Sequence, residues 1–277
     1  MGQANIFVGE IMNSGIEKYL SGEYLYGDDF DSCSIEKWYK DEEDAYYELT
    51  HDFTEYEYYA FNDYYAYSHF GDRQFKTCLA IGCANGDDVK SIAGNVGGYI
   101  ALEPAEKWWT GTIGGKPARY IKPAVSGKIP LNDDAVDLAV CLGVLHHIPN
   151  VSYVISEVYR VMERGGILIL REPIFSMGDW RKKRRGLTSR ERGIPQRLLV
   201  NILKETGFEI LSAKPCMVPT TTRIARLFGI KNAYNSRVMV VIDRISSLLL
   251  QWNMRYRRNN VLKKLAPTSL YILAKKN

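Results

Sequence analysis

The stretch Cys78–Val89 constrains the fold of this 277-residue chain more than any other. Residues 79–81 are apolar and predict a short buried strand. The small residues 82–86 follow as a tight turn, and Asp87 and Asp88 are expected to open a helix, because acidic side chains complement the helix dipole. A glycine turn between strand and helix lets a ligand approach the backbone closely, since glycine has no Cβ.

Three further apolar stretches follow the turn at the spacing of alternating strands and helices. Residues 99–102 end at Glu103, about 20 residues after the turn, where nucleotide-binding α/β folds carry an acid for the ribose. The alternative, a surface acid at a strand end, stays open. Residues 136–142 run into a histidine pair, and residues 165–172 form a fourth candidate strand. This alternation predicts an α/β fold with a parallel sheet.

Taken together, these segments resemble the class I S-adenosylmethionine-dependent methyltransferases. The resembled subgroup has a D-x-G-C-G-x-G loop, which reads A-I-G-C-A-N-G at 80–86, and a V-L-H-H-I-P segment, found at 144–149. The resemblance covers roughly residues 76–218 and a final strand near Leu270. It implies a Rossmann-like methyltransferase fold with a mostly parallel central sheet and an antiparallel last strand. It also implies S-adenosyl-L-methionine as cofactor and S-adenosyl-L-homocysteine as product.

The resemblance also assigns the cofactor-binding positions. They are Gly82, Cys83, Ala84, Asn85, Gly86, Glu103, Pro104, Val125, Ser126 and Leu142. The chain departs from the family at three of its usual residues: Ala80 replaces an acid, Ala84 replaces a glycine, and Val125 stands where an acid follows the third strand. These departures keep a non-catalytic binding module on the same fold as an alternative.

The histidine pair supplies candidate catalytic groups. Methyl transfer to a hydroxyl is an in-line displacement in which the acceptor loses a proton, and histidine has a suitable pKa for accepting it. We expect His146 or His147 to act as the base and Glu172 to orient a histidine. Neighbouring side chains usually point apart, so one histidine is expected to face the substrate. A purely structural role for this segment is the alternative.

The chain divides into two expected regions. Residues 1–75 form a helical lid rich in tyrosine and acid, and residues 76–277 form the methyltransferase core with a helical insertion at about 220–265. In the resembled family the segment before the first strand often covers the cofactor. Tyr65, Tyr67 or His69 is therefore a candidate to cover its methionine end, with ordinary core packing as the alternative. The insertion and the lid are expected to roof the site together.

The segment Gly178–Pro195 is a basic loop at the carboxyl end of the fourth strand, where open α/β sheets bind ligands. Its candidate substrate-binding residues are Trp180, Arg181, Arg184 and Arg192. A solvated loop is the alternative. The loop and the late insertion resemble those of bacterial polysaccharide-pathway and other sugar methyltransferases. This resemblance favours O-methylation of a saccharide or glycan intermediate, with a quinone or other small molecule as the alternative acceptor.

Charge is distributed unevenly along the chain. Residues 1–75 carry 17 acidic and 4 basic side chains, whereas residues 181–277 carry 4 acidic and 22 basic ones. The basic end either binds an anionic partner or is neutralised by the acidic end within one fold. Residues 238–254 and the basic residues after them predict a helix that packs on the core or lies on an anionic membrane. A homodimer also stays open.

Other classes of function are not expected. Five scattered cysteines without a C-x-x-C pair argue against a disulfide scaffold or a structural zinc site, and no metal is expected. The basic residues do not alternate with aromatics, and no nucleic-acid recognition fold is visible, so no nucleic acid is expected as a partner. No secretory leader pattern opens the sequence. We therefore expect a cytoplasmic location, with peripheral contact at the inner membrane face as an option.

Overall fold

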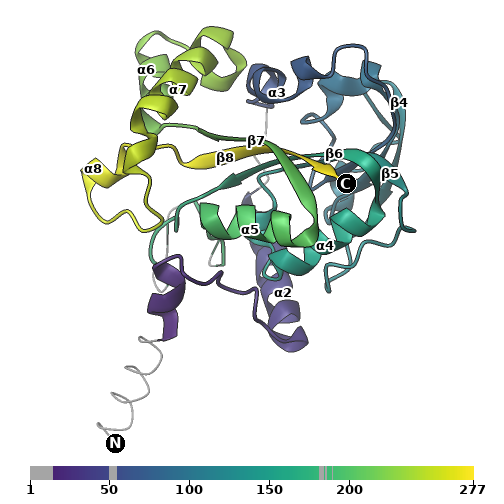
Figure 1. Ribbon diagram of the computed structural model, residues 1–277, viewed down its shortest axis with the longest axis horizontal. Coiled ribbons are helices and arrows are strands. Elements are labelled where there is room, and N and C mark those ends of the chain that lie inside the picture. Colours follow the sequence, from purple (N-terminus) through teal and green to yellow (C-terminus); the bar gives the residue numbers. More distant parts are fainter. Residues whose placement is uncertain (1–14, 50–54, 181–183, 185, 189) are drawn as a thin grey trace, which may run out of the picture.

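A computed structural model describes residues 15–49, 55–180, 184, 186–188 and 190–277 (Figure 1). Its centre is an eight-stranded sheet with the strand order β3-β4-β2-β1-β5-β6-β8-β7. The strands are β1 (Phe75–Ile81), β2 (Val96–Leu102), β3 (Thr112–Ile113), β4 (Lys116–Ile121), β5 (Val136–Leu142), β6 (Met162–Pro173), β7 (Phe208–Cys216) and β8 (Ser269–Lys276).

The five central strands are parallel, as the alternating pattern predicted. β1 pairs with β2 on one side and with β5 on the other, and β5 pairs with β6. The chain therefore proceeds outward from β1 in one direction and, after β4, continues from β5 in the other. Such a reversal of strand order opens a crevice at the carboxyl ends of the two central strands, which is where ligands bind in open α/β sheets.

The far edge of the sheet confirms the predicted antiparallel last strand. β8 lies between β6 and β7 and is antiparallel to both, with Leu170 opposite Ile272. At the other edge, β3 and β4 form a short hairpin that the sequence analysis did not anticipate. Its turn holds Gly114 and Gly115, both with positive φ.

Helices cover both faces of the sheet and define two cores. On one face lie α4 (Val151–Val161) and α5 (Gln196–Thr206), whose apolar residues pack with Leu79, Ala139 and Leu170. On the other face lie α3 (Tyr59–Tyr65) and α7 (Arg237–Leu250), which pack with the intervening residues of the same strands. The strict alternation of side chains along each strand explains why one short strand serves both cores.

Two predicted helix boundaries are wrong. The segment after the glycine turn is the 3₁₀ helix η3 (Lys90–Asn95), and Asp88 is buried ahead of it, so the two acids do not open an α-helix. The apolar residues of 151–164 have helical spacing and predict a helix over that range, but α4 ends at Val161, because β6 begins at Met162 and pairs with Val136. Pairing with the neighbouring strand thus outweighs the helical pattern of the last three residues.

The N-terminal region occupies both sides of the sheet. Leu25 belongs to the core beneath α4, and the Asp28 carboxylate accepts hydrogen bonds from Ser152 N at 2.8 Å and Ser152 Oγ at 2.6 Å at the start of α4. The helix α2 (Ser32–Leu49) lies on the α4 side in Figure 1, while α3 lies on the opposite face. The region expected as one lid is therefore divided between the two faces of the sheet, with α2 on one face and α3 on the other.

The late insertion is largely helical, as expected. It comprises α6 (Pro219–Leu227), η6 (Ala233–Asn235), α7, η7 (Gln251–Asn253) and α8 (Val261–Lys264). These elements form one flank of the molecule in Figure 1, and α7 and η6 contact α3. None of the helices in the described part of the chain combines the length and the apolar character that a membrane crossing requires.

Candidate active site

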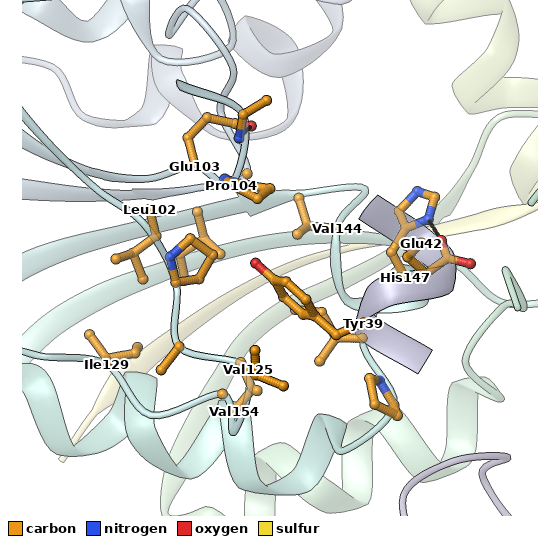
Figure 2. Close-up of a pocket in the computed structure, with 18 of the residues that line it drawn as sticks. Tyr39, Glu42, Leu102, Glu103, Pro104, Val125, Ile129, Val144, His147 and Val154 are labelled. Atoms are coloured by element: carbon orange, nitrogen blue, oxygen red, sulfur yellow. Dashed lines mark hydrogen bonds and ion pairs between the residues drawn. The ribbon is translucent and has the colours of Figure 1, made fainter. Parts of the chain in front are cut away.

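A cavity of about 240 Å³ lies at the carboxyl ends of β1, β2 and β5. Its walls include Gly82 after β1, Glu103 after β2 and Gly143 after β5. Apolar side chains make most of the remaining wall, among them Leu102, Ile129, Val144 and Val154, as Figure 2 shows. The cavity therefore occupies the crevice at the reversal of strand order, the position predicted for ligand binding.

Neighbouring side chains pack closely against the two glycines of the turn. Gly82 has a φ of +61°, and a Cβ there would lie 2.6 Å from Val144 Cγ2. Gly86 has a φ of +84°, and a Cβ there would lie 2.5 Å from Ile113 Cδ1. Ala84 adopts a positive φ as well, at +48°, where the resembled family has glycine. Both glycines are thus required by conformation and by space.

Glu103 links the turn to the end of β2. Its Oε2 accepts a hydrogen bond from Ala84 N at 2.9 Å, and its Oε1 accepts one from Ala105 N at 3.0 Å. Burial raises the pKa of this carboxyl, and the two backbone donors oppose the rise. The carboxyl lines the cavity with its orientation fixed by the main chain, as a residue that binds a polar ligand requires.

The turn that carries the histidines is hydrogen-bonded through both its N–H groups and its carbonyl groups. Glu172 is buried and accepts hydrogen bonds from Val144 N at 2.9 Å and Leu145 N at 2.8 Å. Arg192 is fully buried and donates to the carbonyls of the same turn, including His146 O at 2.9 Å. The turn is therefore positioned by two charged side chains that face it from β6 and from the basic loop.

His146 lies between two carboxylates. Its Nδ1 is 2.8 Å from Glu172 Oε2, and its Nε2 is 3.5 Å from Glu191 Oε1. Burial lowers the pKa of His146, but the hydrogen bonds and charges of Glu172 and Glu191 outweigh that effect and raise it to about 9. His146 is thus protonated at neutral pH and cannot accept a proton there.

His147 faces the cavity and has a different partner. Its Nδ1 is 2.8 Å from Glu42 Oε2, and both residues line the cavity, where Figure 2 places them together at one side. Contrary to the expectation for neighbouring side chains, the rings of His146 and His147 lie with their centroids only 4.1 Å apart. With Nδ1 donating to Glu42, Nε2 of His147 is left as the acceptor.

Among the cavity residues missed in the sequence analysis are Tyr39, Glu42 and Thr188. Tyr39 projects from α2 into the middle of the cavity in Figure 2, while the residues expected as a cover lie elsewhere. Tyr65 and Tyr67 are buried in the opposite core, where the Tyr67 hydroxyl donates to Asp88 O at 2.7 Å. The sequence does contain a pattern that could have pointed to α2: Trp38 and Tyr39 stand one helical turn before Glu42.

The cofactor positions implied by the resemblance divide into two groups. Gly82, Glu103, Pro104 and Val125 line the cavity. The others do not line it: Cys83, Ala84, Asn85, Gly86, Ser126 and Leu142. Among these, Cys83 and Leu142 are buried in the core on the α3 face, and Asn85 Nδ2 donates to Asp87 Oδ2 at 3.0 Å.

The described residues of the basic loop bind the protein itself. The Trp180 ring stacks on Tyr26 at 5.1 Å. Arg184 donates to Glu191 O at 2.6 Å and Thr188 O at 2.7 Å. Arg192 uses Nε, Nη1 and Nη2 to make five hydrogen bonds to main-chain carbonyls. This arrangement does not support the expected substrate contact by Arg192, and Arg181 lies outside the described residues.

Acidic and basic ends of the chain also pair directly. Arg190 donates to Asp41 Oδ2 through Nε at 2.9 Å and through Nη2 at 2.8 Å, which joins the basic loop to α2. Arg257 Nη1 lies 2.7 Å from Glu17 Oε2. Part of the charge asymmetry is therefore neutralised within the fold.

Two buried ionisable side chains, Asp88 after the glycine turn and Arg171 on β6, each retain an unused polar atom, and neither lines the cavity. Asp88 Oδ1 and Arg171 Nη1 are buried without a hydrogen-bond partner in the described part of the chain. Arg171 packs over the Tyr58 ring at 4.2 Å, and its Nη2 would lie 3.8 Å from a Cβ on Gly143. A carboxyl and a guanidinium with free hydrogen-bonding capacity are groups that would suit the amino and carboxylate groups of a methionine moiety.

A second set of groups could hold a metal ion. His146, His147 and Glu191 each offer one ligand atom, and these atoms lie within 4.8 Å of one another. The cysteine pattern gave no indication of this cluster. In the structure each histidine already has a carboxylate partner, so the cluster also forms a charge-balanced network without an ion.

Comparisons with known proteins show what the domain is similar to. Residues 79–170 match the family model described as a methyltransferase domain. A solved complex of the Haloferax volcanii Trm112 activator with a candidate methyltransferase contains a chain with 11% identity, a TM-score of 0.51 and coverage of 87% of this chain and 96% of that one. An S-adenosylmethionine dependent methyltransferase from Mesorhizobium loti has 15% identity, a TM-score of 0.49 and coverage of 74% and 92%. No curated protein matches.

The fold and the cavity at the strand reversal define a nucleotide-binding α/β protein of the Rossmann-like kind. The matched domain is more specific. Residues 79–170 belong to a class I S-adenosylmethionine-dependent methyltransferase domain, and the protein is an enzyme of that class with S-adenosylmethionine as its cofactor. The predicted class, fold and cofactor are therefore confirmed.

Proposed function

We propose that the protein transfers a methyl group to a hydroxyl of a saccharide or glycan intermediate, with His147 as the base. The observation that carries the proposal is the hydrogen bond between His147 Nδ1 and Glu42 Oε2 at the cavity wall. Glu42 holds the ring in the tautomer that leaves Nε2 able to accept a proton. A neutral sugar hydroxyl is a poor nucleophile, so proton removal as the methyl is transferred lowers the barrier.

The other residues of the site act by position. The Gly82 turn and Glu103 would hold the cofactor, which supplies the electrophilic methyl group. Glu172 and Arg192 fix the turn on which His147 stands, so that the base and the acceptor can be aligned. His146, protonated between Glu172 and Glu191, contributes a fixed positive charge near the base.

A hydroxyl-bearing acceptor is also favoured by Glu42 itself. Its Oε1 is buried and has no hydrogen-bond partner among the described residues, so it can accept a hydrogen bond from a second hydroxyl of the acceptor. Acceptors with neighbouring hydroxyls are typical of saccharides. An acceptor attached to lipid and methylated at the inner face of a membrane, with the enzyme in the cytoplasm, is part of the proposal. A homodimer is compatible with it but not required.

A quinone or other phenolic small molecule is the second candidate acceptor. The apolar side chains that line most of the cavity favour it, because a flat aromatic ring would be desolvated there at little cost. The two candidates separate in a panel of nucleotide sugars, glycans and phenols assayed with isotopically labelled cofactor. Label found only in phenols would contradict the saccharide proposal.

The role of the base is tested with His147→Gln, which keeps a side-chain amide near Glu42. We expect turnover to fall about 10²- to 10⁴-fold, while the affinity for S-adenosylhomocysteine stays the same. Glu42→Gln should lower turnover less, because it removes only the orientation of the ring. His69→Gln is the matched control, since His69 is exposed. Unchanged turnover in His147→Gln would exclude His147 as the base.

A further inference from the structure

The helix α7 exposes an apolar stripe on the face opposite its core contacts. Val238, Val241, Ile245, Leu248, Leu249 and Trp252 are between 43% and 73% exposed. At 100° per residue, the five positions within α7 fall within a sector of about 100°, and Trp252 follows directly in η7. The buried residues of the same helix, Met239, Val240, Asp243 and Ser247, lie on the other side. The helix therefore packs on the core with one face and presents a second apolar face to solvent.

Neighbouring elements of the insertion also expose apolar side chains. Leu227 and Phe228 at the end of α6 are 84% and 75% exposed. Val261 and Leu262 of α8 are 75% and 73% exposed, and Asn253 Nδ2 holds this segment near the end of α7 by donating to Leu262 O at 2.7 Å. The exposed apolar side chains thus gather on three neighbouring helices of one flank, whereas those of an ordinary soluble protein are scattered singly.

The stripe is fixed in its outward position by a buried carboxylate. Asp243 is fully buried and accepts hydrogen bonds from Met217 N, Val218 N and Thr221 Oγ1, each at 2.8 Å. These bonds join the middle of α7 to the end of β7 and the start of α6. The exposed face is therefore a consequence of how the helix is anchored, and rotation of α7 to bury it would break three hydrogen bonds to a buried acid.

The charged residues of the insertion itself are nearly all basic, although Arg237 and Arg257 pair with Asp63 and Glu17 of the N-terminal region. Residues 219–265 contain ten lysine or arginine residues and a single acid, the buried Asp243. Arg223, Arg226, Lys231, Arg255 and Lys264 are among the exposed cations. A partner for this surface must therefore accept apolar side chains and carry negative charge at its margin. A second copy of the chain fits poorly, because it would bring one basic surface against another.

We propose that the surface formed by α6, α7 and α8 binds an anionic lipid bilayer. Its aromatic and aliphatic side chains would enter the boundary between headgroups and acyl chains, while lysine and arginine contact the phosphates. An apolar helix face with a basic margin is the sequence and structural pattern of helices that lie in the membrane interface. The proposal goes beyond the proposed methyl transfer and does not depend on the identity of the acceptor.

The test is co-sedimentation of the full chain with vesicles. We expect binding to vesicles of phosphatidylcholine mixed with phosphatidylglycerol, little binding to phosphatidylcholine alone, and weaker binding at high salt. Leu249→Asp and Trp252→Asp should each lower the bound fraction about tenfold or more, because a charge is introduced into the inserted face. Replacing exposed cations should weaken binding by about fivefold for each charge that lies at the surface.

The matched control is Leu211→Asp. Leu211 is a half-exposed leucine on β7, outside residues 219–265, and its substitution should leave vesicle binding unchanged. Binding of S-adenosylhomocysteine by every variant establishes that the core is folded. Equal sedimentation of wild type and Leu249→Asp would overturn the proposal. A concentration-dependent dimer that Leu249→Asp abolishes, without vesicle binding by the wild type, would overturn it in favour of self-association.

Discussion

Glu172 and Arg192 hold the same turn of backbone, one through its N–H groups and the other through its carbonyl groups. Glu172 accepts from Val144 N and Leu145 N at 2.9 and 2.8 Å, and Arg192 donates to the carbonyls of residues 145, 146, 148 and 149 at 2.9 to 3.2 Å. The two side chains come from β6 and from the basic loop. The position of His147 therefore depends on two segments that meet only in the folded protein.

Loss of the Arg192 guanidinium should reduce stability. We expect Arg192→Met to lower the free energy of unfolding by about 3–5 kcal/mol, because buried carbonyls lose their donors. Arg190→Met, which breaks a partly exposed pair with Asp41, should cost less than about 1 kcal/mol. Urea unfolding of both variants measures the difference. If Arg192→Met is as stable as wild type but has a raised Michaelis constant, Arg192 contacts the substrate after all.

The glycine turn should be intolerant of a side chain. We expect Gly82→Ala to weaken binding of S-adenosylhomocysteine at least about tenfold, because its Cβ would lie 2.6 Å from Val144 Cγ2 and displace the cavity wall. Gly71→Ala is the matched control, since Gly71 also has a positive φ, +53°, but nothing lies within 4 Å of its Cβ position. Isothermal titration of both variants with S-adenosylhomocysteine measures the two affinities, and the control shows how much of any loss comes from backbone strain alone. Equal affinities would show that the turn does not contact the cofactor.

The unused polar atoms of Arg171 predict a selective effect on cofactor binding. We expect Arg171→Met to weaken S-adenosylhomocysteine by about tenfold, since a charge-assisted hydrogen bond contributes roughly 1.5–3 kcal/mol. 5′-Methylthioadenosine lacks the amino and carboxylate groups, so its affinity should not change. Titration of both ligands against both proteins gives the comparison. A parallel loss for the two ligands would indicate that Arg171 supports the site only structurally.

Asp88 predicts a dependence of stability on pH. Burial raises the pKa of Asp88 to about 8, although the charge of Arg171 opposes the rise. Because the folded-state pKa lies above the unfolded one, the contribution of Asp88 to stability is complete below the unfolded pKa and is lost as pH rises through about 8. We expect Asp88→Asn to stabilise the protein more at pH 9 than at pH 6, as measured by urea unfolding. Destabilisation at both pH values would show that Asp88 is ionised and paired in the native state.

The sequence could predict the parts of the fold that follow from local pattern. The strand at 79–81, the acid at Glu103 and the histidine pair stand in the order of a known domain, and the structure brings Gly82, Glu103 and His147 to one cavity. Glu42 and Tyr39 could not be found in the same way. They reach the cavity because Trp38 Nε1 donates to His147 O at 2.7 Å and docks α2 against the turn, a contact between residues 109 positions apart.

For the basic loop, the sequence showed the arginines but not what they bind. Its arginines read as an anion-binding segment, and composition alone cannot distinguish an anionic ligand from the carbonyls and carboxylates of the protein itself. The described residues Arg184, Arg190 and Arg192 all bind within the chain. For the insertion, the sequence left two alternatives, because the pattern of residues 238–254 was compatible with a core helix or with a membrane-facing one. The structure shows one apolar face packed and the other exposed.

The cluster of His146, His147 and Glu191 allows a last prediction, on metal removal. We expect treatment with EDTA followed by dialysis to leave methyl transfer unchanged. The reason is that Glu172 and Glu191 already satisfy His146, while Glu42 satisfies His147, so proton acceptance by His147 needs no ion. The measurement is turnover before and after chelation, with Zn²⁺ and Mg²⁺ added back separately. Loss of turnover that Zn²⁺ restores would assign these three residues as metal ligands, and the His147 base would then have to be abandoned.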